Sequence, residues 1–304
     1  MKLIVGYEAT DQGRDALELG GFLSEILAAT PLVATVMPWP EYLMPPRDLE
    51  RALEVDTSKS FATARDRLAH LDPETVAVAN HSPAEALYKL AEEERAILVV
   101  IGSSHRGALG RVLLGSMGVS LLHGAPCGIA VAPRGYAERT RRNLLRVGVA
   151  FDGSPEAWSA LETGIGFADR LDTSLTVLTV AEPPRYGYSA SLSALAADEY
   201  ETHQHGERRQ ILDRALTRVP DGIPVDGRLL RGDPGQCLSD AAKGLDLLIM
   251  GSRGYGPLRR TLLGSVAARV MHTAECPLLV LPRGAGVDPL GVGDAAIAAR
   301  KSAP

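Results

Sequence analysis

The sequence predicts an α/β protein of two tandem domains, each a five-stranded parallel sheet with helices on both faces. Three observations support this fold class. Short strand-like runs alternate with helical patterns along each half of the chain. The runs are apolar throughout, as in parallel strands that helices cover on both sides. The second half also repeats the first, and 304 residues suit two domains of roughly 150 residues each.

The elements of the first half alternate strictly between strand and helix. The strands are short and rich in β-branched residues, and the helices show apolar residues at three- and four-residue spacing. The glycine- and proline-rich stretches fall between them. The pattern predicts strands over 2–7, 32–37, 76–80, 97–102 and 128–133, and helices over 16–27, 48–70, 83–95 and 116–124.

The repeat covers a whole domain, because its period is about 145 to 150 residues, far longer than a solenoid unit. For example, LLGSVAARVMHTAECPLLVLPRG repeats LLGSMGVSLLHGAPCGIAVAPRG. The charged stretch between the copies reads as a linker, and the Ala- and Gly-rich end carries no period. We expect a first domain over 1–135, a linker over 136–145, a second domain over 146–284 and a disordered tail over 285–304.

Composition excludes several classes of protein. A formal charge of −5 with a pI near 5.8 argues against a nucleic-acid partner, which requires a basic surface. No apolar run approaches the roughly 20 residues of a membrane span. The N-terminus begins directly with a strand pattern and has no secretory signal, which favours a cytoplasmic location. In that compartment the three cysteines are expected to be reduced.

One glycine-rich stretch, LLIMGSRGYGPLRRTLLGS over 247–265, carries the chemistry. An apolar strand ends at Gly251, Gly254 follows, and Gly264-Ser265 begins a helix. Glycines permit close backbone approach, and a helix N-terminus offers unpaired N–H groups to an anion. The alternative is that the glycines only mark turns and Ser265 only caps a helix. Because the stretch follows a parallel strand, where open α/β sheets bind ligands, a phosphate site is favoured.

Asp152 ends the first strand of the second half, at the same sheet edge as Gly251. A carboxylate there can accept hydrogen bonds from ribose hydroxyls. The Asp-Gly-Ser-Pro sequence is also suited to an Asx turn or a helix cap. Beside the glycine set, the ribose role is favoured over the cap.

The strand-end Asp, the G-x2-G-x9-G-S spacing and the closing apolar strand before Pro together resemble the universal stress protein family, in both halves. The resemblance implies a Rossmann-like fold, similar to that of the adenine nucleotide alpha hydrolases, and ATP as ligand, with or without Mg²⁺. It implies no metal site built from side chains and no catalytic residue. The implied nucleotide-binding residues are Ala150, Phe151, Asp152, Val180, Met250, Gly251, Arg253, Gly254, Gly264, Ser265, Val266 and Ala267.

The first half departs from this pattern. His105 stands where Gly254 does, and Glu8 stands where Asp152 does. An imidazole would crowd a backbone that must approach phosphate, unless the histidine itself donates to it. Two interpretations stay open, a degenerate structural partner and a modified, weaker nucleotide site. The residues of that site would be Glu8, Val36, Gly102, His105, Gly115 and Ser116.

The remaining histidines suggest no second site, since the spacing of His203 and His205 suits neither a helical zinc pair nor a nearby cysteine set. The apolar last strands, GIAVAP and PLLVLP, do indicate how the two halves associate. An exposed apolar edge strand needs a partner, and in the resembled family it pairs with its counterpart across a two-fold axis. The two halves are therefore expected to form an internal pseudo-dimer, and a further homodimer is left open.

These features favour a regulatory, ATP-binding stress protein without efficient catalysis. Two alternatives remain, a slow ATPase on the same fold and a nucleotide-free dimerisation or scaffold module. The stress signal and the downstream partner leave no trace in the sequence.

Overall fold

The computed structural model describes residues 1–37, 46–104, 110–113, 115–122, 125–139, 146–183, 194–252 and 264–282. Side chains of 46–56, 116 and 194–201 lie outside this description. In the first half the elements are β1 (Lys2–Gly6), α1 (Asp11–Leu27), β2 (Thr30–Met37), α2 (Pro46–Arg67), β3 (Glu74–Ala79), α3 (Pro83–Glu93), β4 (Leu98–Gly102), α4 (Ser116–Leu122) and β5 (Gly128–Ala132).

The second half repeats this order. Its elements are β6 (Arg146–Ala150), α5 (Pro155–Leu171), β7 (Ser174–Ala181), α6 (Ala194–Leu216), β8 (Val225–Arg231), α7 (Pro234–Ala242), β9 (Leu247–Gly251), α8 (Ser265–Thr273) and β10 (Leu278–Leu281). The predicted alternation of strands and helices is confirmed, with ends that differ by a few residues.

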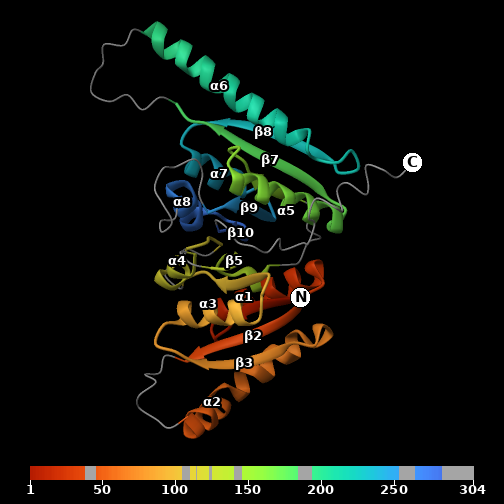
Figure 1. The fold of residues 1–304 in the computed structure, drawn as a ribbon, viewed down its shortest axis with the longest axis vertical. Coiled ribbons are helices and arrows are strands. Elements are labelled where there is room, and N and C mark those ends of the chain that lie inside the picture. Colours follow the sequence, from red (N-terminus) through yellow and green to blue (C-terminus); the bar gives the residue numbers. More distant parts are fainter. Residues whose placement is uncertain are drawn as a thin grey trace.

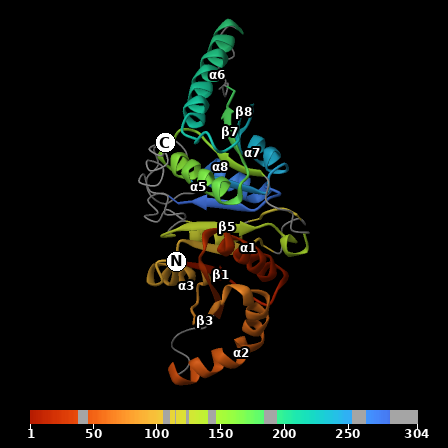
Figure 2. The same cartoon turned by 90° about the vertical axis from the view of Figure 1, so that its right-hand side faces the viewer.

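The ten strands form one sheet in the order β3-β2-β1-β4-β5-β10-β9-β6-β7-β8. Within each half all neighbouring strands are parallel, as predicted. The two halves meet through a single antiparallel pair, β5 with β10, in which Leu279 lies opposite Ala130. Figure 2 shows these two strands side by side in the middle of the molecule. The sheet runs the length of the molecule, with α2 and α6 at its opposite ends (Figure 1).

Helices cover both faces of the sheet. One apolar core lies under α1, α2, α5 and α6, and the other lies under α3, α4, α7 and α8. Each core contains residues of both halves, so the apolar interior continues across the β5–β10 junction. Because helices cover both faces, side chains on both sides of each central strand are buried, which stabilises strands that are apolar throughout.

The duplication is visible in the packing as well as in the sequence. The Thr35 hydroxyl donates to the Tyr7 carbonyl at 2.9 Å, and the Thr179 hydroxyl donates to the Phe151 carbonyl at 2.9 Å. Both threonines are buried, and both bonds tie the second strand of a half to the end of its first strand. The same local solution therefore fixes the strand end beside the site in each copy.

Part of the predicted linker belongs to the first half. Residues Tyr136–Glu138 form a 3-10 helix, η2. The buried carboxylate of Asp15 on α1 accepts hydrogen bonds from the N–H groups of Gly135 and Ala137, both at 2.8 Å. The rest of the predicted linker, 140–145, and the predicted tail lie outside the described residues.

A glycine on the first helix of each half allows close contact with the sheet. A Cβ on Gly164 would lie 2.4 Å from Val149 Cγ2, and one on Gly20 would lie 2.4 Å from Val5 Cγ2. We expect Gly164→Ala to reduce the free energy of unfolding by about 1–3 kcal/mol through overpacking. Urea denaturation followed by circular dichroism measures this.

Gly206 provides the matched control, because it lies within α6 and a Cβ there would meet nothing within 4 Å. Gly206→Ala should raise the free energy of unfolding by about 0.5–1 kcal/mol, since alanine loses less backbone entropy in a helix. Equal effects of the two substitutions would contradict the close-approach explanation.

The three thiols are unpaired and differ in exposure. Burial raises the pKa of Cys127 and of Cys276 to about 12, and burial also raises the pKa of the half-buried Cys237. Since the thiolate is the reactive form, raising pKa suppresses reaction at pH 8. We expect one thiol per native chain, Cys237, to react slowly with a thiol reagent, and three after unfolding. Fast labelling of more than one native thiol would show that a half opens readily.

Candidate functional site

In the first half a cavity of about 520 Å³ opens at the carboxyl edge of the parallel strands. This is where open α/β sheets bind ligands. Its walls come from the ends of β1, β2 and β4 and from α1, α3 and α4. Four of the predicted residues line it, namely Glu8, Val36, Gly102 and Gly115. The cavity is also lined by residues outside the predicted set, including Tyr7, Thr10, Gln12, Leu87, Ser103, Ser104 and Met117.

The side chains of the other two residues predicted for this half are not described. His105 lies outside the described residues, and Ser116 is the first residue of α4 with a side chain that is not described. The alternative interpretations of His105 therefore both stay open.

The surroundings of two glycines of the predicted motif, Gly102 and Gly115, differ in how much room they leave for a side chain. A Cβ on Gly102 would lie 2.1 Å from the carbonyl oxygen of Gln12, so the start of α1 already requires glycine there. A Cβ on Gly115 would have Ser104 Cβ as its nearest neighbour at 3.6 Å, an ordinary contact. Packing within the protein thus explains Gly102, whereas at Gly115 a Cβ would make only an ordinary contact with Ser104.

Ser103 organises the loop that follows β4. Its buried hydroxyl oxygen accepts from the N–H of Leu113 at 2.6 Å, and it lies 3.2 Å from the Leu113 carbonyl oxygen. The N–H of Ser104 also donates to that carbonyl at 2.7 Å. The only sequence signal for this role of Ser103 is that a serine directly follows a buried strand in both copies, at Ser103 and Ser252.

In the second half the predicted residues gather at the equivalent edge. The strand β6 lies between β7 and β9, so Ala150, Met250 and Gly251 end neighbouring parallel strands. The N–H of Gly264 donates to the carbonyl of Ser252 at 3.0 Å, which brings the start of α8 to the end of β9. Val180 lies near the end of β7, half-buried against the α7 and α8 core, as does Val266.

Asp152 follows β6 and is half-buried. Its Oδ1 accepts from the N–H of Ser154 at 2.9 Å, which is the Asx turn that the sequence offered as an alternative. The cap of α5 is not Asp152 but Ser154, whose hydroxyl accepts from the N–H of Ala157. Within the described part of the chain, Oδ1 is the Asp152 side-chain atom that accepts a hydrogen bond.

Three of the predicted residues are buried. The Phe151 ring packs edge-on against Trp158, with centroids 4.8 Å apart, and only 3% of the residue is exposed. Met250 and Ala267 are likewise in the core. A contact of Phe151 with a ligand would therefore have to come from its backbone, and its carbonyl already accepts from Thr179.

The start of α8 lacks the side-chain cap that four other α-helices have. Side chains cap four helices, with Thr10 on α1, Ser82 on α3, Ser154 on α5 and Asp233 on α7. In α8 the cap position holds Gly264, which offers no side-chain hydrogen bond. The alternative in which Ser265 only caps this helix does not hold, because Ser265 is already its first helical residue and is exposed. The first N–H groups of α8 thus have no acceptor from the cap side chain.

Arg253 and Gly254 lie outside the described residues. Among the residues that are described, no three His, Cys, Asp or Glu side chains lie close enough together to hold a metal ion. None of the helices in that part of the chain is long and apolar enough to cross a membrane.

The family is shown by comparison with known proteins. A model of the universal stress protein family matches residues 1–133 and again residues 144–282. The chain therefore belongs to the universal stress protein family and carries its domain twice, as the sequence motifs implied.

Curated relatives share this organisation. Universal stress protein Rv2319c of Mycobacterium tuberculosis is 27% identical over 299 residues, which cover 93% of this chain and 100% of that protein. A universal stress protein of Mycolicibacterium smegmatis is 33% identical over 191 residues, covering 60% of this chain and 61% of its own.

Solved structures agree in fold. A putative universal stress protein from Pseudomonas aeruginosa has a TM-score of 0.63 at 16% identity, covering 99% of this chain and 98% of its own. A universal stress protein from Archaeoglobus fulgidus has a TM-score of 0.62 at 17% identity, covering 93% and 96% of the two chains. At such identities the likeness concerns the fold alone.

The hydrogen bonds of Ser103 lead to a prediction for the first-half loop. Ser103→Ala removes the acceptor for the Leu113 N–H, and a buried unpaired N–H costs about 1–3 kcal/mol. We expect the free energy of unfolding to fall by about that amount, as measured by urea denaturation. As a control, Ser159→Ala removes an exposed hydroxyl on α5 and should change stability by less than about 0.5 kcal/mol. A neutral Ser103→Ala would mean that the loop is held by other contacts.

Proposed function

We propose that the second half of this protein binds an adenine nucleotide, with ATP as the main ligand, and that binding serves regulation and not efficient catalysis. The observation that carries the proposal is the open start of α8. Side chains of Ser, Thr or Asp cap α1, α3, α5 and α7, whereas the cap position of α8 holds a glycine. Uncapped N–H groups and the helix dipole favour a phosphate.

The neighbouring residues fit a nucleotide around that phosphate position. We assign the ribose to Asp152, which stands at the end of β6 with one carboxylate oxygen used by the Asx turn. The adenine is assigned to the backbone near Val180 on β7. Gly251, Arg253, Gly254, Gly264 and Ser265 are assigned to the ribose and phosphates, with Ala150, Phe151, Met250, Val266 and Ala267 around them.

The first half is proposed to keep a modified and weaker site. Its cavity of about 520 Å³ falls within the roughly 300–1,000 Å³ of small-molecule sites, so side chains have not filled it. Glu8 in place of Asp152 and His105 in place of Gly254 would alter affinity. A Mg²⁺ ion would be carried by the nucleotide phosphates, because no cluster of metal-ligating side chains lies among the described residues.

The β5–β10 pairing supports a further part of the proposal. Each half supplies its last strand to the other, so we propose that the halves act as an internal pseudo-dimer in the cytoplasm. A scaffold without nucleotide is the second candidate, favoured by this same pairing. A homodimer would have to use another surface of the molecule.

Mass spectrometry of ligand released from the purified protein, with stoichiometry per chain, tests the proposal directly. We expect one or two adenine nucleotides per chain, one if only the second half binds. The proposal is contradicted if the denatured extract contains no nucleotide and calorimetry of the dialysed protein shows no heat of ATP binding. The scaffold would then be the remaining candidate function. Turnover of labelled ATP well above background would instead indicate a slow ATPase.

A double variant tests the residue assignments. Asp152→Ala with Gly254→Val should weaken ATP binding to the second half at least about 100-fold, since each lost interaction is worth on the order of 1.4 kcal/mol. The matched control is Asp240→Ala with Gly222→Val, an exposed aspartate on α7 and a glycine whose Cβ would meet nothing within 4 Å. Calorimetry measures both. Full affinity in the Asp152/Gly254 variant would place the site elsewhere.

A further inference from the structure

The segment between β4 and α4 is here called the first-half glycine loop. Its far end, residues 110–113, is bonded to the second half of the protein. The N–H of Val112 donates to the carbonyl of Ala274 at 2.8 Å, and Val112 is fully buried. Ala274 is the residue at which α8 ends, just before β10. The loop that borders the first-half cavity is thus attached to the helix whose other end forms the second site.

Arg139 joins the same two segments a second time. Its Nη2 donates to the carbonyl of Gly110 at 2.9 Å, and its Nη1 donates to the carbonyl of Glu275 at 3.0 Å. One guanidinium therefore bridges a carbonyl of each half. A planar fork with fixed donors suits such a bridge, whereas a lysine ammonium is a single point on a flexible stem.

The backbone on both sides of this bridge is held in place. Arg139 directly follows η2, which the two hydrogen bonds to Asp15 fix on α1. Gly110 has φ +83°, which L side chains rarely adopt, and a Cβ there would lie 3.4 Å from Arg139 Nη2. The N–H of Gly110 also donates to the carbonyl of Arg134 at 2.8 Å. The turn is thus shaped to present its carbonyl to Arg139.

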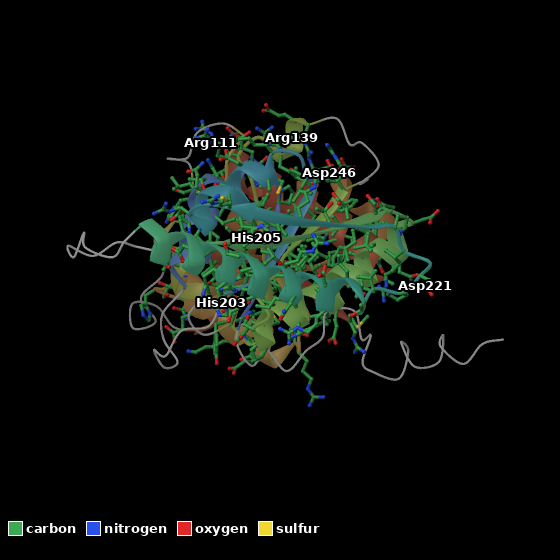
Figure 3. The ribbon with its side chains drawn as sticks, turned by 90° about the horizontal axis from the view of Figure 1, so that it is seen from above. Arg111, Arg139, His203, His205, Asp221 and Asp246 are labelled. Carbon is green, nitrogen blue, oxygen red and sulfur yellow. The ribbon has the colours of Figure 1, made fainter. Side chains whose placement is uncertain are left out.

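A second arginine adds less. Arg111 Nε lies 3.4 Å from the Glu275 carboxylate, but about half of the arginine side chain is exposed. Exposed pairs of this kind contribute little. Figure 3 shows Arg111 and Arg139 on the same side of the molecule, away from His203 and His205. Arg139 is exposed as well, but its guanidinium donates to two backbone carbonyls, one of each half, and this pair of hydrogen bonds is what distinguishes it from Arg111.

We propose that Arg139 is a positioning residue, which holds the first-half glycine loop against the end of α8 and so sets the shape of the first-half site from the second half. This positioning role does not require a ligand. Its effect on nucleotide binding rests on the proposed function, and the two are tested separately below.

Hydrogen exchange of the full chain without ligand tests the positioning role. Arg139→Ala should speed exchange of the Gly110 and Val112 amides about tenfold or more, since bonds donated by a charged group are the stronger ones. Exchange in β2 should stay unchanged. Arg139→Lys should show most of the same effect. Arg209→Ala removes an exposed arginine paired with Asp213 on α6 and should change neither region.

Three results would overturn the proposal. The first is equal exchange at Val112 in Arg139→Ala and Arg209→Ala. The second is an equal rise in exchange throughout the sheet in Arg139→Ala. The third is full protection in Arg139→Lys. The binding arm is independent of these. If two nucleotides bind per chain, Arg139→Ala should weaken the weaker class about tenfold and leave the stronger class unchanged. If no nucleotide binds to the wild-type chain, the proposed function fails while the exchange result still decides the role of Arg139.

Discussion

The antiparallel pairing of β5 with β10 is the interaction on which the rest of the structure depends. Each strand is the last of its half, entirely buried, and apolar on both faces. Left at an edge, each would expose a row of unpaired N–H and C=O groups beside apolar side chains. Pairing them satisfies both rows at once and joins the two half-cores into two continuous layers. Because the pair is antiparallel, the segment after β5 lies beside the turn before β10, which is why Arg139 can reach Glu275.

The same pairing joins two halves that share one scaffold and differ at the candidate site. Both halves keep the scaffold of the site, as the matching bonds of Thr35 and Thr179 and the matching glycines 20 and 164 show. Those residues hold strand ends and helices in place, and every copy needs them to fold. The strand-end residues Glu8 and Asp152 differ between the halves while this scaffold stays the same.

The site itself was predictable only in part. The spacing of glycines after an apolar strand located the sheet edge, and Glu8, Val36, Gly102 and Gly115 do line one cavity. The sequence did not distinguish a glycine that packing requires, Gly102, from one where a Cβ would make only an ordinary contact, Gly115. It also left open whether Ser265 caps α8, whereas the cap position holds Gly264. A shift of one residue at a helix start is below the resolution of periodicity, because both positions satisfy the same pattern.

By itself the sequence determined the α/β class, the duplication and the place of the candidate site in each half. These follow from local patterns, since apolar runs, helical spacing and turn residues act over a few neighbours. Only the tertiary structure decided that the halves share one sheet, that Phe151 turns into the core, and that residues 136–139 brace the first-half loop. Arg139 and Glu275 are 136 positions apart, and their contact depends on the strand pairing between them. No periodicity records such a contact, because it exists only once the chain has folded.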